Sequence, residues 1–475
     1  MIAPTIHLGA GPDLAPQALE LSQATKHVLV VGATGSGKTV TLQALTEGFA
    51  TAGIPVLLAD VKGDLSGLAA QAAPGPQLDA RRHLADALPR LASALDVRFY
   101  DCFGEGGTRF SVPLRTLGVQ GLARLLSLST AQVSTISIAF ELCRAAGSDC
   151  ADLDSLRAML RWMAAHREAL AVDYGLVHPG TIGVIDRRLA ALASEGGGQL
   201  VGPDPRLQDL AMARDTQGRG VVSLAQAQRL FQTPQLYAAL WYSVLTSLFN
   251  DLPELGPVAQ PELVVVIDEA HVLFAGAPPA MIAEIEKVVR LIRSRGVALV
   301  FASQNPGDIP DRILAQLGNR IVHAMRGFAA SDRRMLRALA DTMPKQDDAE
   351  DVHKTFPGLA TGSAVVSVLD HDGVPGNAVK TVMRPPCSRI GTLGKAGLAR
   401  HLDRQHVLVA SGRTGERIRA AARPSTPVGR HETRCPPKSS ASAAGAVAGS
   451  DPAPDGFALG FRIGALLRRI AVFRF

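Results

Sequence analysis

The stretch HVLVVGATGSGKTVTLQAL, residues 27–45, decides the fold of this chain. It joins a short β-branched apolar run to a glycine-rich turn and then to a segment with helical spacing. The turn matches G-x-x-x-x-G-K-[ST], a pattern whose backbone N–H groups point at phosphate oxygens. Its members are Gly32, Ala33, Thr34, Gly35, Ser36, Gly37, Lys38 and Thr39. We therefore predict a phosphate cradle at the amino end of a helix, whose dipole also attracts anions.

The residue types in this turn assign roles toward ATP and Mg²⁺. Lys38 is expected to bridge the β- and γ-phosphates, and the Thr39 hydroxyl to ligate the metal. Downstream, VVVIDEAHVLF (residues 264–274) is a strand that ends in two acids. Asp268 fits the second magnesium ligand, and Glu269 is placed to polarise the water that attacks the γ-phosphate. The acidic pair favours a hydrolase over a switch.

Two further strand ends carry polar groups. Gln304 follows the run VALVFAS and is predicted to sense the γ-phosphate and hold the attacking water, with Ser303 in support. The loop after the strand IPVLLAD carries Asp60, Lys62 and Asp64. Ligands of open α/β sheets gather at such loops, but solvated turn residues fit this loop equally well, so both readings stay open.

Short apolar runs alternate with helix-like stretches, which predicts an α/β fold with a mostly parallel sheet covered on both faces. The predicted strands are 27–31, 54–60, 97–101, 220–224, 263–268 and 297–303. Residues 114–215 have helical spacing and are predicted to be an insertion between two strands. A hairpin is expected around Asp372 and Gly373. From residue 385 periodicity fades into Arg, Ala, Pro and Ser, which predicts a largely disordered tail.

The net charge of +6 is unevenly distributed. Residues 384–475 hold 16 Lys and Arg against 5 Asp and Glu, whereas residues 1–383 hold 33 against 38. The basic total therefore gives no argument for a nucleic-acid groove in the body. An odd number of cysteines without a C-x-x-C pair argues against a disulfide framework and a zinc site, and for a cytoplasmic protein. No membrane span or secretory signal is evident.

Basic side chains recur on the predicted helix 282–295. Lys287, Arg290 and Arg293 share a face, and Arg295 follows. The pattern is typical of a solvated helix face, and it also fits an arginine finger that completes the site of a neighbouring subunit.

Taken in order, these stretches resemble the HerA-like branch of the HerA/FtsK superfamily of RecA-type P-loop ATPases. The matching segments are GATGSGKTVTLQAL, ADVKGDLSGL, VVVIDEAHVLF, IEKVVRLIRSRGVALVFASQNPGDIP, ILAQLGNRIVHAMRGF and PPCSRIG. They run from about residue 27 to residue 391. The predicted division is an N-terminal extension (1–25), a RecA-like core (26–113 and 216–391), a helical insertion (114–215) and a basic tail (392–475).

The resemblance implies a hexameric ring that hydrolyses ATP and translocates or unwinds double-stranded DNA, sometimes beside a nuclease. It also implies the phosphate role for Lys38, the sensor role for Gln304, and the finger role for Arg293 or Arg295. Two other classes remain: an ATPase that remodels or signals to proteins without a DNA track, which the acidic body favours, and a small-molecule kinase. Glu269 directly after Asp268 argues against the kinase.

Overall fold

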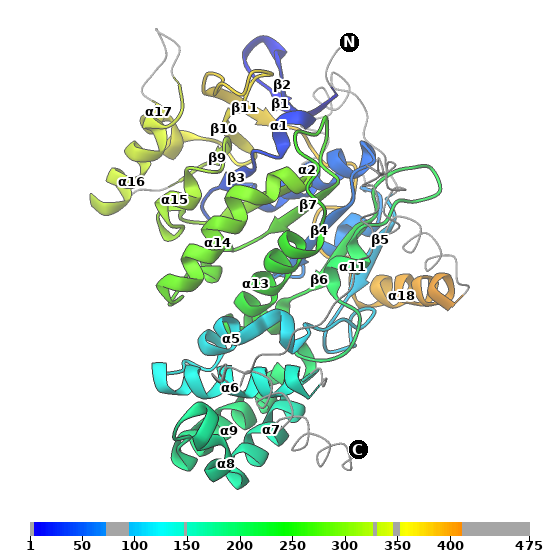
Figure 1. The fold of residues 1–475 in the computed structure, drawn as a ribbon. Coiled ribbons are helices and arrows are strands. Elements are labelled where there is room, and N and C mark those ends of the chain that lie inside the picture. The colour runs from blue at the N-terminus through cyan, green and yellow to red at the C-terminus, as the bar shows by residue number, and fades with distance from the viewer. Residues whose placement is uncertain (1–3, 73–94, 147–149, 326–329, 345–351, 411–475) are drawn as a thin grey trace, which may run out of the picture.

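The structure is a computed structural model that describes residues 4–72, 95–146, 150–325, 330–344 and 352–410. Within these residues, eleven strands form one sheet in the order β2-β1-β11-β10-β9-β3-β8-β7-β4-β6-β5. The strands from β9 to β5 run parallel to one another, whereas β10, β11, β1 and β2 each pair antiparallel with their neighbours. The predicted α/β class with a mostly parallel sheet is confirmed (Figure 1).

The strands are β1 (Thr5–Ala10), β2 (Pro16–Glu20), β3 (Val28–Val31), β4 (Val56–Asp60), β5 (Val97–Tyr100), β6 (Val222–Gln226), β7 (Leu263–Ile267), β8 (Val297–Ser303), β9 (Asn319–His323), β10 (Ser363–Ser367) and β11 (Val379–Met383). The α-helices are α1 (Leu21–Ala24), α2 (Lys38–Thr51), α5 (Leu114–Leu125), α6 (Thr130–Ala145), α7 (Leu153–Ala165), α8 (Arg167–Tyr174), α9 (Pro179–Leu192), α10 (Gly198–Leu200), α11 (Leu207–Ala211), α12 (Gln228–Phe231), α13 (Pro234–Asp251), α14 (Pro279–Leu291), α15 (Asp311–Leu314), α16 (Ala330–Asp341), α17 (Val352–Thr355) and α18 (Lys395–Ala410).

The central strands are apolar along their whole length because both faces of the sheet are covered. Side chains alternate between two cores: Val28 and Val30 of β3 pack with α2, and Leu29 and Val31 pack with α13, α14 and the insertion. A period of two in a strand sends neighbouring side chains to opposite faces. The six predicted strands are therefore short and mostly apolar, and all six are present.

The predicted insertion is helical: α5 to α11 lie between β5 and β6, and α6 to α9 form a bundle away from the sheet (Figure 1). The predicted hairpin is also confirmed, since β10 pairs with β11 and the Gly373 N–H donates to the Asp370 carbonyl at 2.9 Å. No helix in the described part of the chain combines the length and the apolarity that a membrane crossing requires.

Three expectations need correction. Residues 5–20, given no strand by the sequence, form β1 and β2, which extend the sheet beyond β11. The predicted loss of order after residue 385 is wrong for α18, whose Gln405 side chain bonds to the backbone N–H and C=O of Phe99 on edge strand β5. The rest of the predicted tail, 411–475, lies outside the described residues.

The third correction concerns the cysteines. Cys143 and Cys150 are joined by a disulfide, with their Cα atoms 6.1 Å apart. The expectation of no disulfide framework does not hold for this pair, whose cysteines lie in the last turn of α6 and just before α7. The predicted cytoplasmic location therefore draws no support from the cysteines, and it stays a prediction.

Candidate functional site

Four neighbouring strands deliver the candidate site. β3, β8, β7 and β4 lie side by side and run parallel, so their carboxyl ends meet at one edge of the sheet, where open α/β sheets bind ligands. The turn with Lys38 follows β3, Gln304 follows β8, and the pair Asp268 and Glu269 follows β7. Lys62 lies on the loop after β4.

The glycine-rich turn has a shape that only glycine permits at two points. Gly37 has φ of +109° and Gly35 has φ of +79°, both in the region that L side chains avoid. A Cβ on Gly37 would also lie 2.9 Å from the Cα of Gly362, on the loop before β10. The backbone of Ser36 accepts a hydrogen bond from Gly362 at 2.8 Å. The loop before β10 therefore holds the glycine turn in a fixed backbone conformation, as a phosphate cradle requires.

Lys38 is the first residue of α2, and its side chain is only 5% exposed. Its Nζ lies 3.7 Å from both Asp268 Oδ1 and Glu269 Oε1, and it has no hydrogen-bond partner among the described residues. A buried ammonium without a bonded acceptor is costly. This unsatisfied donor beside the glycine turn fits a bound phosphate. Thr39, next along α2, is half-buried.

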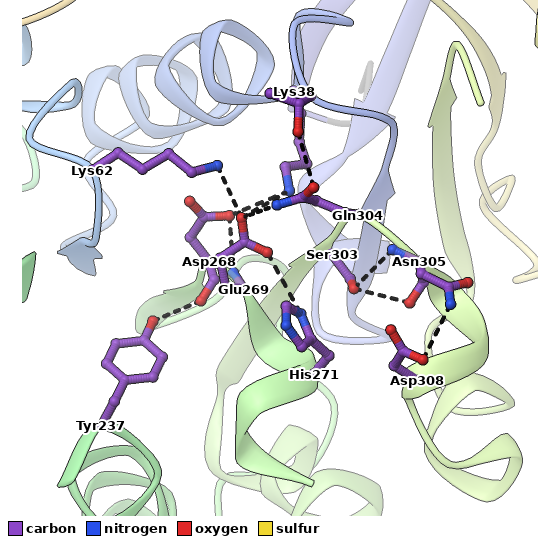
Figure 2. A network of polar contacts seen from close by, with 11 residues as sticks. Lys38, Lys62, Tyr237, Asp268, Glu269, His271, Ser303, Gln304, Asn305 and Asp308 are labelled. Carbon is purple, nitrogen blue, oxygen red and sulfur yellow. Dashed lines mark hydrogen bonds and ion pairs between the residues drawn. The ribbon is translucent and has the colours of Figure 1, made fainter. Parts of the chain in front are cut away.

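The acidic pair is almost completely buried, with both residues 2% exposed. Burial raises the pKa of Asp268, and Lys38 opposes the rise. The backbone of Asp268 is fixed by the Tyr237 hydroxyl, which donates to its carbonyl at 2.6 Å. Burial also disfavours the charged form of Glu269, but Lys38, Lys62 and Gln304 outweigh burial and lower its pKa. Both acids point at the cations of the site (Figure 2).

Gln304 connects the glycine turn to Glu269. Its Nε2 donates to Glu269 Oε1 at 2.8 Å, and its Oε1 accepts from the Thr34 hydroxyl at 2.9 Å. The amide therefore lies between the phosphate cradle and the acid that is expected to orient water. The Ser303 hydroxyl bonds to the backbone of Asn305 at 3.0 Å. The predicted support of Gln304 by Ser303 stays a prediction, since the hydrogen bonds of this hydroxyl within the described residues go only to the Asn305 backbone.

The helicase HerA-like C-terminal family model matches residues 6–421. The chain belongs to this family. A stretch of 105 residues is 31% identical to the DNA double-strand break repair helicase HerA of Sulfurisphaera tokodaii. That match spans 22% of this chain and 20% of the relative.

Solved structures share the fold of this HerA-like chain. VirB4 of Thermoanaerobacter pseudethanolicus matches with a TM-score of 0.54 and 16% identity, over 80% of this chain and 96% of that one. The plasmid coupling protein TrwB in complex with a GTP analogue matches with a TM-score of 0.53 and 14% identity, over 80% and 89%. TrwB in complex with ADP and Mg²⁺ matches with a TM-score of 0.51 and 15% identity over the same shares. The resemblance stated from the sequence is confirmed at the level of family and fold.

Asp60 and Lys62, at the end of β4 in this HerA-like chain, have different roles that the sequence could not distinguish. The Asp60 carboxylate accepts the backbone N–H of Gly63 at 2.6 Å and of Leu65 at 3.1 Å. Asp60 thus shapes the loop. Lys62 instead donates to Glu269 Oε1 at 2.9 Å and is part of the site.

The candidate finger arginines lie at the amino ends of the strands, opposite the site. Arg293 and Arg295 belong to the short 3-10 helix η5 (Ile292–Arg295) at the amino end of β8, so neither reaches the site of its own subunit. The Arg295 guanidinium donates to the Leu252 carbonyl and lies 4.9 Å from the Phe249 ring centroid. Arg293 is exposed. A role for either residue in a neighbouring site stays a prediction.

Two positioning contacts were missed from the sequence. Tyr237 of α13 anchors Asp268, as described above. Arg124 of α5 donates to the carbonyls of Val272 and Ala275, at 3.3 Å and 3.0 Å, just after Glu269. Neither residue carries a local signal: Arg124 lies 151 residues from Ala275 along the chain, and Tyr237 bonds only to the backbone carbonyl of Asp268, 31 residues away. The insertion thus contacts the acidic loop directly.

Proposed function

We propose that this HerA-like chain binds ATP with Mg²⁺ at the glycine turn, hydrolyses it, and uses the energy to move along double-stranded DNA as a closed ring. The observation that carries ATP hydrolysis is the buried Lys38 ammonium, which lacks a hydrogen-bonded acceptor and lies 3.7 Å from both Asp268 and Glu269. The solved complexes of TrwB with ADP and Mg²⁺, and with a non-hydrolysable ATP analogue, support the nucleotide.

Each residue has a distinct task. The N–H groups of the glycine turn and the Lys38 ammonium bind the phosphates. Thr39 and Asp268 would hold Mg²⁺, which neutralises charge on the phosphate oxygens. Glu269 accepts a proton from the attacking water while Gln304 holds that water. The water oxygen bonds to the γ-phosphorus, and the bridging oxygen leaves with ADP.

The ring proposal follows from what the site lacks. No arginine approaches Lys38 or Glu269 among the ion pairs and hydrogen bonds of the described residues. A trans arginine is worth on the order of 10³-fold or more in rate. Exposed Arg293 is our candidate, and head-to-tail contacts in a closed ring, most simply a hexamer, would deliver it. Mixing Arg293→Ala with Glu269→Gln should restore some turnover, since some interfaces then pair an intact site with an intact finger. If co-assembled rings recover no ATP turnover, Arg293 is not the finger.

DNA as the track is supported by family membership and by the similarity to the repair helicase HerA. The specific observation against it is the acidic body, with 38 Asp and Glu against 33 Lys and Arg in residues 1–383, which favours a protein-remodelling ATPase as the second candidate. ATP turnover with and without duplex DNA, at two salt concentrations, separates them. We expect stimulation that weakens as salt rises, because phosphate contacts release counterions. Turnover indifferent to DNA at low salt would favour the protein-directed candidate.

A further inference from the structure

Lys62 and Lys38 flank one carboxylate oxygen. Lys62 Nζ lies 2.9 Å from Glu269 Oε1, and Lys38 Nζ lies 3.7 Å from the same atom. The two ammonium groups approach from different elements, the loop after β4 and the start of α2 (Figure 2). The site therefore contains a second cation at its acidic end, in addition to the lysine of the glycine turn.

The hydrogen bonds on Glu269 occupy the oxygen that faces these cations. Oε1 accepts from both Lys62 and Gln304, at 2.9 Å and 2.8 Å, which uses the two lone pairs of a carboxylate oxygen. The other oxygen, Oε2, has only His271 Nδ1 at 3.5 Å and no hydrogen bond in the described residues. A general base needs a free oxygen within hydrogen-bond reach of its water. With both lone pairs of Oε1 occupied, only Oε2 is open to a water, and Oε1 can accept a proton only after Lys62 moves away.

The two lysines differ in their freedom to move. The Lys38 side chain is 5% exposed and is held in the core of the site, whereas that of Lys62 is 38% exposed. The backbone beneath Lys62 is fixed by Asp60, which accepts the N–H groups of Gly63 and Leu65. A flexible four-carbon stem on a fixed loop lets the ammonium change partner without moving the backbone.

We propose that Lys62 is a further catalytic residue that binds the terminal phosphate of ATP and, in the nucleotide-free subunit, rests on Glu269. This inference rests on the proposed ATP hydrolysis. When the terminal phosphate arrives, the Lys62 ammonium exchanges the carboxylate for a phosphate oxygen. Glu269 Oε1 then becomes available to the attacking water. ADP has no terminal phosphate at that position, so it leaves the contact between Lys62 and Glu269 in place.

The test compares nucleotides rather than rates alone. Calorimetry with ADP and with a non-hydrolysable ATP analogue, each with Mg²⁺, is run on the wild type, Lys62→Met and Lys62→Arg. Lys62→Met should weaken the ATP analogue about 10- to 100-fold and ADP by less than about twofold, as expected for loss of one charged hydrogen bond. Lys62→Arg should restore part of the difference, and kcat should fall in Lys62→Met. Lys380→Met, an exposed lysine on β11, is the matched control and should behave as the wild type.

An unchanged ratio of ATP-analogue to ADP affinity in Lys62→Met would overturn the proposal, whatever happens to kcat, because the lysine would then not touch the terminal phosphate. Lys62→Gln provides the same comparison if Lys62→Met does not fold. A wild type that turns over no ATP would instead refute the proposed function, so the two failures are distinguishable.

Discussion

Arg124 offers a direct test of whether the helical insertion positions the hydrolytic acid. Arg124 is 8% exposed, and its guanidinium donates to the carbonyls of Val272 and Ala275. Val272 lies in the 3-10 helix η4 (Ala270–Leu273), which starts directly after Glu269, and Ala275 lies just beyond its end. Glu269 itself has φ of +49°, a conformation that surrounding structure must maintain. Replacement of Arg124 by Met keeps the packing of the stem and removes both hydrogen bonds.

The magnitude follows from the two contacts. The bond to Ala275 at 3.0 Å is well formed, and the bond to Val272 at 3.3 Å is weak. Hydrogen bonds from charged donors contribute about 1.5–3 kcal/mol each. Burial disfavours the charged form of Arg124 and lowers its pKa, and this cost offsets part of the gain. We expect Arg124→Met to lower the free energy of unfolding by about 2 kcal/mol and kcat by about tenfold, through misplacement of Glu269.

Urea denaturation and a coupled ATPase assay measure the two effects. The matched control is Arg161→Met, an exposed arginine on α7 of the same insertion, which should change neither quantity. If Arg124→Met unfolds at the urea concentration of the wild type and keeps its kcat, the contact does not position the acidic loop, and the reasoning fails.

Two further predictions concern the cradle and the edge of the sheet. Gly37→Ala should abolish ATP-analogue binding in calorimetry, because the new Cβ would lie 2.9 Å from Gly362 at φ of +109°. Gly35→Ala, with φ of +79° and open space around it, should weaken ATP-analogue binding only by the backbone strain, about 1 kcal/mol. Equal losses of affinity in the two variants would refute the steric argument. A chain of residues 1–410 should keep the melting temperature and turnover of the full chain, whereas residues 1–394 should melt earlier and aggregate, because Gln405 no longer pairs with Phe99 on edge strand β5. Identical melting curves for the two truncations would show that α18 does not stabilise this edge.

The sequence predicted what is encoded locally. The glycine turn, the buried strands and the acids after β7 each depend on neighbours within a few residues, so pattern and spacing were sufficient. β1 was missed because it pairs with β11, more than 350 residues away, and β2 was missed with it because β2 joins the sheet only through β1. The order of α18 was missed for the same reason, since it depends on the Gln405 contact with Phe99.

The candidate site shows the same division. Lys38, Asp268, Glu269 and Gln304 were placed together correctly because the strand ends of a parallel sheet converge. The different tasks of Asp60 and Lys62 were not predictable, since both are polar residues at the end of β4 and only the folded backbone decides which one points at Glu269. The sequence also could not show that Arg295 bonds within its own subunit.

The central claim is that Glu269 activates water for ATP hydrolysis at this site, and Glu269→Gln tests it most directly. The amide keeps the size of the side chain and one acceptor oxygen, but it carries no charge and cannot accept the proton. ATP turnover and ATP affinity are measured on the same preparation, beside Lys38→Ala, which should lose affinity. We predict that Glu269→Gln binds ATP as the wild type does and releases no phosphate above background. Wild-type turnover by Glu269→Gln would contradict the account.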